Sequence, residues 1–293
     1  MFKKKFTYKE VRIKQKKDLK ANISGYYVYR NLSTPFTWFF ANMGISPNTI
    51  TLLSLSLCLF GFYFLSLGTY VYFIIGLLFF IIFKILDMSD GETARLCGAT
   101  SIEGVYFDRI SHYLYSFCLG LGIGFGLNKI YSNDFYIFVG VLFALAFTLE
   151  NAIIDLVKSL LVEGAIKKKI DIKHSLYYEN KDAEGSLWQR FLDDLNHGKS
   201  WGKRNIFSKI CGIYPSQGLL YSDTFTAPIL LVLALIEFFL NFIFEIPAIQ
   251  GYPIGLVLLY VAISGISKIA WIITLILRIE IKRSITKTLK EVE

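Results

Sequence analysis

The chain has 293 residues, of which 54% are hydrophobic and 16% aromatic, while only 18% are charged. Its mean hydropathy is +0.49, so the chain has too little polar surface for an ordinary water-soluble protein, and the same apolar content excludes a disordered chain. The net charge of +8 permits a nucleic-acid partner, but the positions of the basic residues along the chain decide that question.

The first 46 residues are basic at their start and rich in aromatic residues afterwards. The stretch from Ile23 to Met43 combines seven aromatic side chains with polar residues such as Arg30 and Asn31. This mixture is typical of a helix that lies in the membrane interface. We therefore expect residues 1–46 to form a basic cytoplasmic tail and an interfacial amphipathic helix, with a plain linker as the alternative.

Six apolar stretches are long enough to cross a membrane. They cover residues 49–67, 70–86, 105–126, 135–161, 225–245 and 254–279. A helix rises about 1.5 Å per residue across about 30 Å of hydrocarbon, and within lipid only helices satisfy all their own backbone hydrogen bonds without closing into a barrel. The sequence therefore predicts an all-α integral membrane protein whose six transmembrane helices form one domain over residues 47–280. The second helix should continue beyond its apolar part, to Leu96.

Basic residues lie almost entirely on one side of these predicted spans. The three short connections on the other side contain a single basic residue, Lys129, whereas the N-terminal tail, the loop 163–222 and the tail 281–293 are rich in lysine and arginine. The positive-inside rule thus predicts that both termini and the long loop are cytoplasmic. Because topology and contact with membrane lipids explain the positive charge, we expect no nucleic-acid partner.

Acidic residues gather where the second predicted span meets the third. Asp87 and Asp90 are three residues apart, and Asp108 and His112 are four residues apart. Each pair therefore shares one face of its helix, and the cytoplasmic connection brings the two pairs to the same depth. Carboxylates are costly at a membrane unless they have a role. Converging oxygen ligands are the kind that Mg²⁺ or Mn²⁺ prefers, together with phosphate oxygens.

Small residues and one arginine flank these acids. Gly91, Ala94 and Gly104 remove side chains where a bulky ligand or a second helix must approach, and Arg95 offers a planar donor to phosphate or to an acid. Taken alone, these residues permit two interpretations: a metal and phosphate site, or a structural network of carboxylates and arginine.

The full pattern, Asp87-x2-Asp90-Gly91-x2-Ala94-Arg95-x8-Gly104-x3-Asp108, resembles the signature of the CDP-alcohol phosphotransferase family, D-x2-D-G-x2-A-R-x8-G-x3-D-x3-D. Seven of the eight fixed positions match. The stretch Pro47-Asn48-Thr49-Ile50-Thr51 is also similar to the family's pattern at the start of its first span. Six spans, an interfacial helix and cytoplasmic termini agree with the family's topology.

The resemblance implies transfer of a substituted phosphate group from a CDP-alcohol to an acceptor hydroxyl, with release of CMP. It also implies two divalent ions, a cytoplasmic active site, a homodimer and one lipid substrate. Asp87, Asp90 and Asp108 would bind the metals and the CDP diphosphate. The other expected CDP-binding residues are Gly91, Ala94, Arg95, Gly104, Asn48 and Thr51. We expect CDP-diacylglycerol as the donor, in phospholipid biosynthesis. A soluble CDP-alcohol that donates to a lipid, sugar or polyol is the alternative, and a catalytically inactive membrane scaffold or a transporter is the rival class.

His112 stands where the family has its fourth aspartate. The resemblance assigns that position to the general base and often to a metal ligand, and an imidazole can serve as either. Loss of one negative charge would weaken the second metal or favour a softer one. A relative without activity is the other interpretation.

Other polar residues inside the predicted spans suggest weaker hypotheses. Glu150, Asn151 and Asp155 lie on adjoining turns of the fourth span, and Lys268 lies in the sixth. They either form a structural ion pair or line an acceptor pocket that binds a polyol or a head-group alcohol. We expect Lys84 to extend its amine to the interface rather than to bind phosphate.

Overall fold

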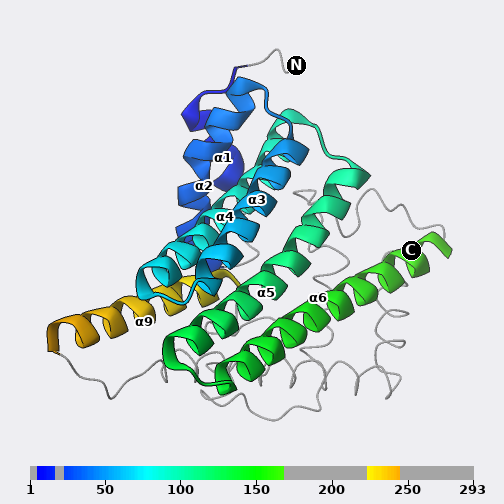
Figure 1. Ribbon diagram of the computed structural model, residues 1–293. Coiled ribbons are helices and arrows are strands. Elements are labelled where there is room, and N and C mark those ends of the chain that lie inside the picture. Colours follow the sequence, from blue (N-terminus) through cyan, green and yellow to red (C-terminus); the bar gives the residue numbers. More distant parts are fainter. Residues whose placement is uncertain (1–4, 17–22, 168–222, 245–293) are drawn as a thin grey trace, which may run out of the picture. The chain divides into compact units, whose positions relative to one another are not determined.

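The computed structural model describes residues 5–16, 23–167 and 223–244, and within these ranges every regular element is a helix (Figure 1). The helices are α1 Tyr8–Lys16, α2 Ile23–Met43, α3 Pro47–Ser66, α4 Tyr70–Cys97, α5 Ile102–Tyr131, α6 Phe135–Lys167 and α9 Asp223–Phe244. The chain forms two compact units, and one boundary between them lies between Thr148 and Leu149, inside α6. The first unit contains α1 to α5, the first part of α6, and α9, and the all-α prediction is confirmed for the described residues.

Four of the described helices are long and apolar enough to cross a membrane. They are α3, α4, α5 and the stretch Phe135–Ile153 of α6, which confirms the first four predicted spans as helices and makes the chain a multi-pass integral membrane protein. The fifth predicted span, 225–245, falls on α9, whose part Ala227–Ile236 is a shorter apolar helix. The sixth, 254–279, lies outside the described residues. The second span continues as one helix to Cys97, as predicted.

Local sequence signals set the ends of the helices that meet at the acidic cluster. Ser46 caps α3 by accepting a hydrogen bond from the Thr49 amide, and Pro47 occupies the first turn, where its missing N–H is harmless. Gly98 ends α4 in the left-handed conformation with φ of +64°. Ser101 then caps α5 by accepting from the Gly104 amide at 3.0 Å. A short connection therefore joins the end of α4 to the start of α5.

The core of the first unit consists of large apolar side chains from α3, α4, α5, α6 and α9. Its fully buried members include Leu65, Phe80, Tyr115, Phe143 and Leu230. The rings of Phe83 and Tyr115 stack with centroids 5.0 Å apart. This contact joins α4 to α5 one helical turn from Asp87 and from His112. In lipid, such close packing holds helices together because exclusion of water supplies little driving force between them.

Glycines allow α5 and α6 to approach backbone to backbone. A Cβ atom added to Gly140 would lie 2.6 Å from the carbonyl oxygen of Gly120 and 2.7 Å from the Cα atom of Gly124. Side chains at these positions would force the two helices apart, so this contact depends on the absence of side chains.

A buried polar contact fixes α2 on α4. The Glu92 carboxylate accepts hydrogen bonds from Ser33 at 3.0 Å and Thr37 at 2.7 Å, and Thr37 also lies 3.1 Å from the Ser89 hydroxyl. Three large aromatic side chains of α2 are exposed, namely Phe36, Trp38 and Phe39, while Tyr29 and Phe40 are buried. The predicted helix over Ile23–Met43 is confirmed with these same bounds, and its polar face turns toward the protein. Its place in the membrane interface stays a prediction.

Candidate metal and phosphate site

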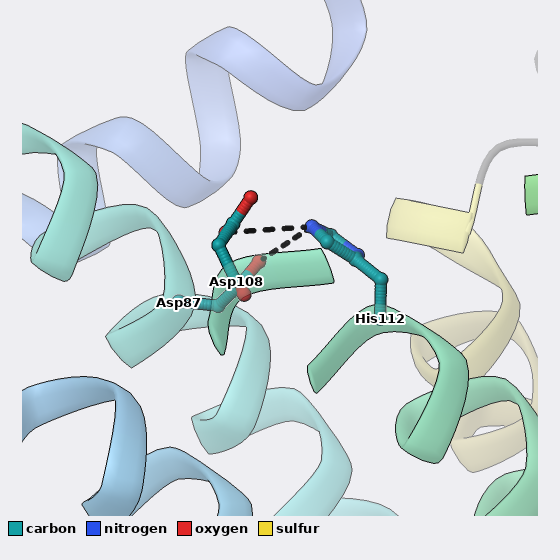
Figure 2. Close-up of side chains that lie close together, drawn as sticks. All are labelled: Asp87, Asp108 and His112. Atoms are coloured by element: carbon teal, nitrogen blue, oxygen red, sulfur yellow. Dashed lines mark ion pairs between the residues drawn. The ribbon is translucent and has the colours of Figure 1, made fainter. Parts of the chain in front are cut away.

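Three of the predicted site residues form a tight cluster where α4 and α5 lie side by side. Figure 2 shows the carboxylates of Asp87 from α4 and Asp108 from α5 close together, with the ring of His112 from α5 facing both. The Nε2 atom of His112 lies 3.7 Å from Asp87 Oδ2 and 3.8 Å from Asp108 Oδ1. One potential ligand atom from each residue lies within 4.8 Å of the other two, so the cluster could hold a metal ion.

The three side chains of the cluster differ in their exposure to solvent. The Asp87 side chain is 9% exposed, that of His112 33% and that of Asp108 45%. The Ser111 hydroxyl donates to the backbone oxygen of Asp108 at 2.6 Å and lies 3.4 Å from Asp87 Oδ1. A ligand can therefore reach Asp108 from outside the helix bundle while Asp87 stays fixed within it.

Asp90 faces the start of α3. Its carboxylate, which is 5% exposed, accepts a hydrogen bond of 2.6 Å from the hydroxyl of Thr51. It lies within electrostatic range of both Asp87 and Asp108. The structure thus brings all four predicted cluster residues to one end of α4 and α5, with Thr51 attached to them.

The donor set suits a divalent cation. Three carboxylates that lie within electrostatic range of one another repel when all are ionised, and a bound cation removes that repulsion. Mg²⁺ and Mn²⁺ bind carboxylate oxygens together with oxygens of substrate phosphates. One of these carboxylates, Asp108, is accessible to solvent. Asp87 and Asp108, together with His112, form the group that could hold such an ion, while the part of Asp90, the choice between Mg²⁺ and Mn²⁺ and the number of ions stay predictions.

The two predicted site glycines lie beside the groups that the sequence suggested for CDP. A Cβ atom on Gly104 would lie 3.2 Å from Asn48 Oδ1 and 3.2 Å from Ser101 Oγ, which places Asn48 of α3 against the first turn of α5. A Cβ atom on Gly91 would lie 3.3 Å from an Arg95 guanidinium nitrogen. Arg95 is exposed and Ala94 is partly buried on the same turns of α4. Their contact with CDP stays a prediction.

The predicted acceptor residues do not belong to this cluster. Asn151 and Asp155 are partly buried residues of α6 in the second compact unit, Glu150 belongs to the same unit, and Lys268 lies outside the described residues. The acceptor pocket and the alternative ion pair with Lys268 both stay predictions.

The prediction that the Lys84 amine extends to the interface is wrong. The Lys84 side chain is 6% exposed, and its ammonium lies 4.2 Å from the centre of the Tyr115 ring and 3.5 Å from His112 Nδ1. The amine does not extend to the interface, because an aromatic face and a ring nitrogen receive it inside the bundle. One signal could have found it: Lys84 is a charged residue within an apolar stretch, one helical turn before Asp87.

A comparison with family models places this cluster within a known group of proteins. The model described as CDP-alcohol phosphatidyltransferase matches residues 44–175, a stretch that begins just before α3 and contains Asn48, Thr51 and the whole acidic cluster. The comparison with curated proteins finds no match.

Proposed function

We propose, because the CDP-alcohol phosphatidyltransferase model matches residues 44–175, that the chain transfers a phosphatidyl group from CDP-diacylglycerol to an acceptor hydroxyl and releases CMP. The acceptor oxygen forms a bond to the phosphorus that carries the diacylglycerol. The bond from that phosphorus to the bridging oxygen breaks, and CMP leaves with that oxygen. The hydroxyl proton passes to a basic group of the site or to water. The product would be a phospholipid.

The cluster of Asp87, Asp108 and His112 in the family-matched stretch is the observation that carries this proposal. Asp87, Asp90 and Asp108 would hold the divalent cation, Mg²⁺ or Mn²⁺, with two ions as the family resemblance implies. When bound, the cation neutralises charge on the diphosphate and on the departing CMP. The chain's own residues bind and orient the donor: Asn48 and Arg95 can hydrogen-bond to it, and Gly91 and Gly104 leave it room.

The membrane setting supports a lipid substrate. Helices α3 and α4 present many large apolar side chains at their surface, among them Leu52, Leu59, Phe60 and Val71, as expected for contact with lipid. A site at the ends of α4 and α5 can meet a lipid donor from the bilayer and a polar acceptor from water. We further propose that this end faces the cytoplasm, together with both termini, and that the protein works as a homodimer.

The test is release of CMP by the purified full-length protein in lipid nanodiscs with Mg²⁺ or Mn²⁺. The donors are CDP-diacylglycerol and a panel of soluble CDP-alcohols, each offered with and without a mixture of small hydroxylated acceptors. We expect CMP release that depends on CDP-diacylglycerol, acceptor and metal, and that a chelator abolishes.

The outcomes separate the candidate functions. Release of CMP from a soluble donor alone would replace CDP-diacylglycerol while retaining the reaction class. Silence with every donor, together with no binding of CMP or CDP-alcohols in the presence of metal, would overturn the proposal in favour of a membrane scaffold. Substitution of Asp134 by asparagine is the matched control for loss of an acid, because Asp134 is exposed in the connection between α5 and α6, where it pairs with Asn128.

A further inference from the structure

The two ring nitrogens of His112 face groups of opposite charge. Nε2 lies 3.7 Å from Asp87 Oδ2 and 3.8 Å from Asp108 Oδ1, whereas Nδ1 lies 3.5 Å from the ammonium of Lys84. Lys84 is 6% exposed and rests on the ring of Tyr115, so it is held inside the bundle on the Nδ1 side. The imidazole therefore lies between a buried cation and two carboxylates.

The chemistry of the two partners decides which nitrogen of the neutral ring carries the hydrogen. An ammonium group has three N–H donors and no acceptor, so the nitrogen beside it must accept. Nδ1 of His112 is then the acceptor, and the ring hydrogen is on Nε2, the atom that faces Asp87 and Asp108. A carboxylate can only accept, so the same tautomer directs the ring N–H at Asp87 and Asp108, whose oxygens lie 3.7 and 3.8 Å from Nε2.

We propose, on the basis of the function proposed above, that Lys84 is a positioning residue that orients the His112 ring so that its Nε2–H is directed at Asp87 and Asp108. This role replaces both roles that the sequence suggested for His112. A histidine that binds a metal through one nitrogen normally donates its other N–H to an acceptor, and Lys84 offers no acceptor. A general base needs a free nitrogen beside the substrate, and the accepting nitrogen of His112 points to Lys84 instead.

This arrangement explains how the chain manages without a fourth carboxylate. A neutral ring whose N–H is directed at two acids reduces the repulsion between them, and Lys84 adds a positive charge on the other side of the ring. A bound cation would then be held by carboxylate oxygens and not by His112. The site needs less positive charge from metal ions than a cluster of four carboxylates would.

Spectroscopy of bound Mn²⁺ tests the ligand assignment without reference to turnover. Pulsed electron paramagnetic resonance on the full-length protein in nanodiscs detects the magnetic coupling of Mn²⁺ to a directly bound imidazole nitrogen. We expect Mn²⁺ to bind without that coupling. A coupling in the wild-type protein that disappears in His112→Gln would overturn the proposal, and failure to bind Mn²⁺ at all would overturn it together with the proposed metal site.

Two amide variants of His112 separate donor from base. Glutamine places an N–H near the position of Nε2, asparagine places one near Nδ1, and neither amide can take up the proton of an acceptor hydroxyl. We expect kcat of His112→Gln to exceed that of His112→Asn about tenfold, the size expected for a hydrogen bond to a charged group. Equal losses of about 100-fold or more in both variants would indicate a general base and would overturn the proposal.

Lys84 variants test the positioning role directly. We expect Lys84→Met to lower kcat about tenfold with little change in the KM for the CDP-alcohol, and to allow nitrogen coupling from the released ring to appear. Lys84→Arg, which keeps a donor, should restore part of kcat. Lys129→Met is the control, since the Lys129 ammonium donates to the Ser66 carbonyl near the C-terminal ends of α5 and α3, at the end of α5 away from His112. Wild-type kinetics in Lys84→Met would overturn the inference and leave the proposed function intact, whereas no CMP release from the wild-type protein would overturn both.

Discussion

The hydroxyl of Thr51 donates a hydrogen bond of 2.6 Å to the carboxylate of Asp90, and this bond joins the first turns of α3 to the motif-bearing part of α4. Both side chains are buried, at 3% and 5% exposure. The start of α3 thereby sets the position of an acid that the family resemblance assigns to metal binding. The short Pro47–Thr51 pattern and the longer acidic pattern, which lie far apart in the sequence, are thus in direct contact.

Removal of this bond should destabilise the protein and lower its activity. In Thr51→Val the buried carboxylate loses a donor, which costs about 1–3 kcal/mol. Thr51→Ser keeps the hydroxyl and should lie close to the wild type. Thermal unfolding in detergent and CMP release measure the two effects, and a Thr51→Val protein as stable and active as Thr51→Ser would contradict this reading of the contact.

Replacement of a single acid of the cluster should lower CMP release or Mn²⁺ affinity. Asp90→Asn is expected to abolish CMP release, and Asp87→Asn and Asp108→Asn should weaken Mn²⁺ binding at least about tenfold, because each removes a charged ligand. Calorimetric titration with Mn²⁺ and the CMP assay measure these changes. Asp134→Asn, far from the cluster along the chain, should leave both unchanged. Unaltered Mn²⁺ affinity in Asp87→Asn would show that the cation binds elsewhere.

The contact between α5 and α6 should tolerate no added carbon atom. Gly140→Ala places its Cβ 2.6 Å from the Gly120 carbonyl, so a backbone must move, and we expect a loss of about 1–3 kcal/mol. Gly122→Ala meets side chains rather than backbone, Leu65 at 3.1 Å and Phe62 at 3.4 Å, and should cost less. The order of the two unfolding temperatures in detergent is the measurement, and the reverse order would show that α5 and α6 separate at low cost.

The polar contact between α2 and α4 should be cooperative. Thr37→Val and Glu92→Gln each weaken the hydrogen bond of 2.7 Å between them, so the double variant should lose less stability than the sum of the single variants. We expect a coupling energy of about 1 kcal/mol from a double-mutant cycle of unfolding free energies. Strict additivity would mean that the two residues do not act together.

The sequence predicted the first four spans because long apolar stretches mark them. The caps at Ser46 and Ser101 and the left-handed Gly98, which set the helix ends, also follow local rules. The convergence of Asp87 with Asp108 and His112 followed from helical spacing and a short connection. The sequence could not reveal contacts that depend on how the helices rotate against one another. Lys84 therefore turned out to face inward, and Glu92, an unassigned position within the motif, proved to be the anchor of α2.

The anchoring of Glu92 by α2 has a consequence for where the chain can be cut. The family-matched stretch starts at residue 44, downstream of Ser33 and Thr37, which hold this carboxylate. A fragment that began at residue 44 would lack the hydroxyls of Ser33 and Thr37 that donate to the Glu92 carboxylate, at a cost of about 1–3 kcal/mol. We therefore expect the smallest piece that inserts and folds by itself to begin before Ser33, upstream of the family-matched stretch.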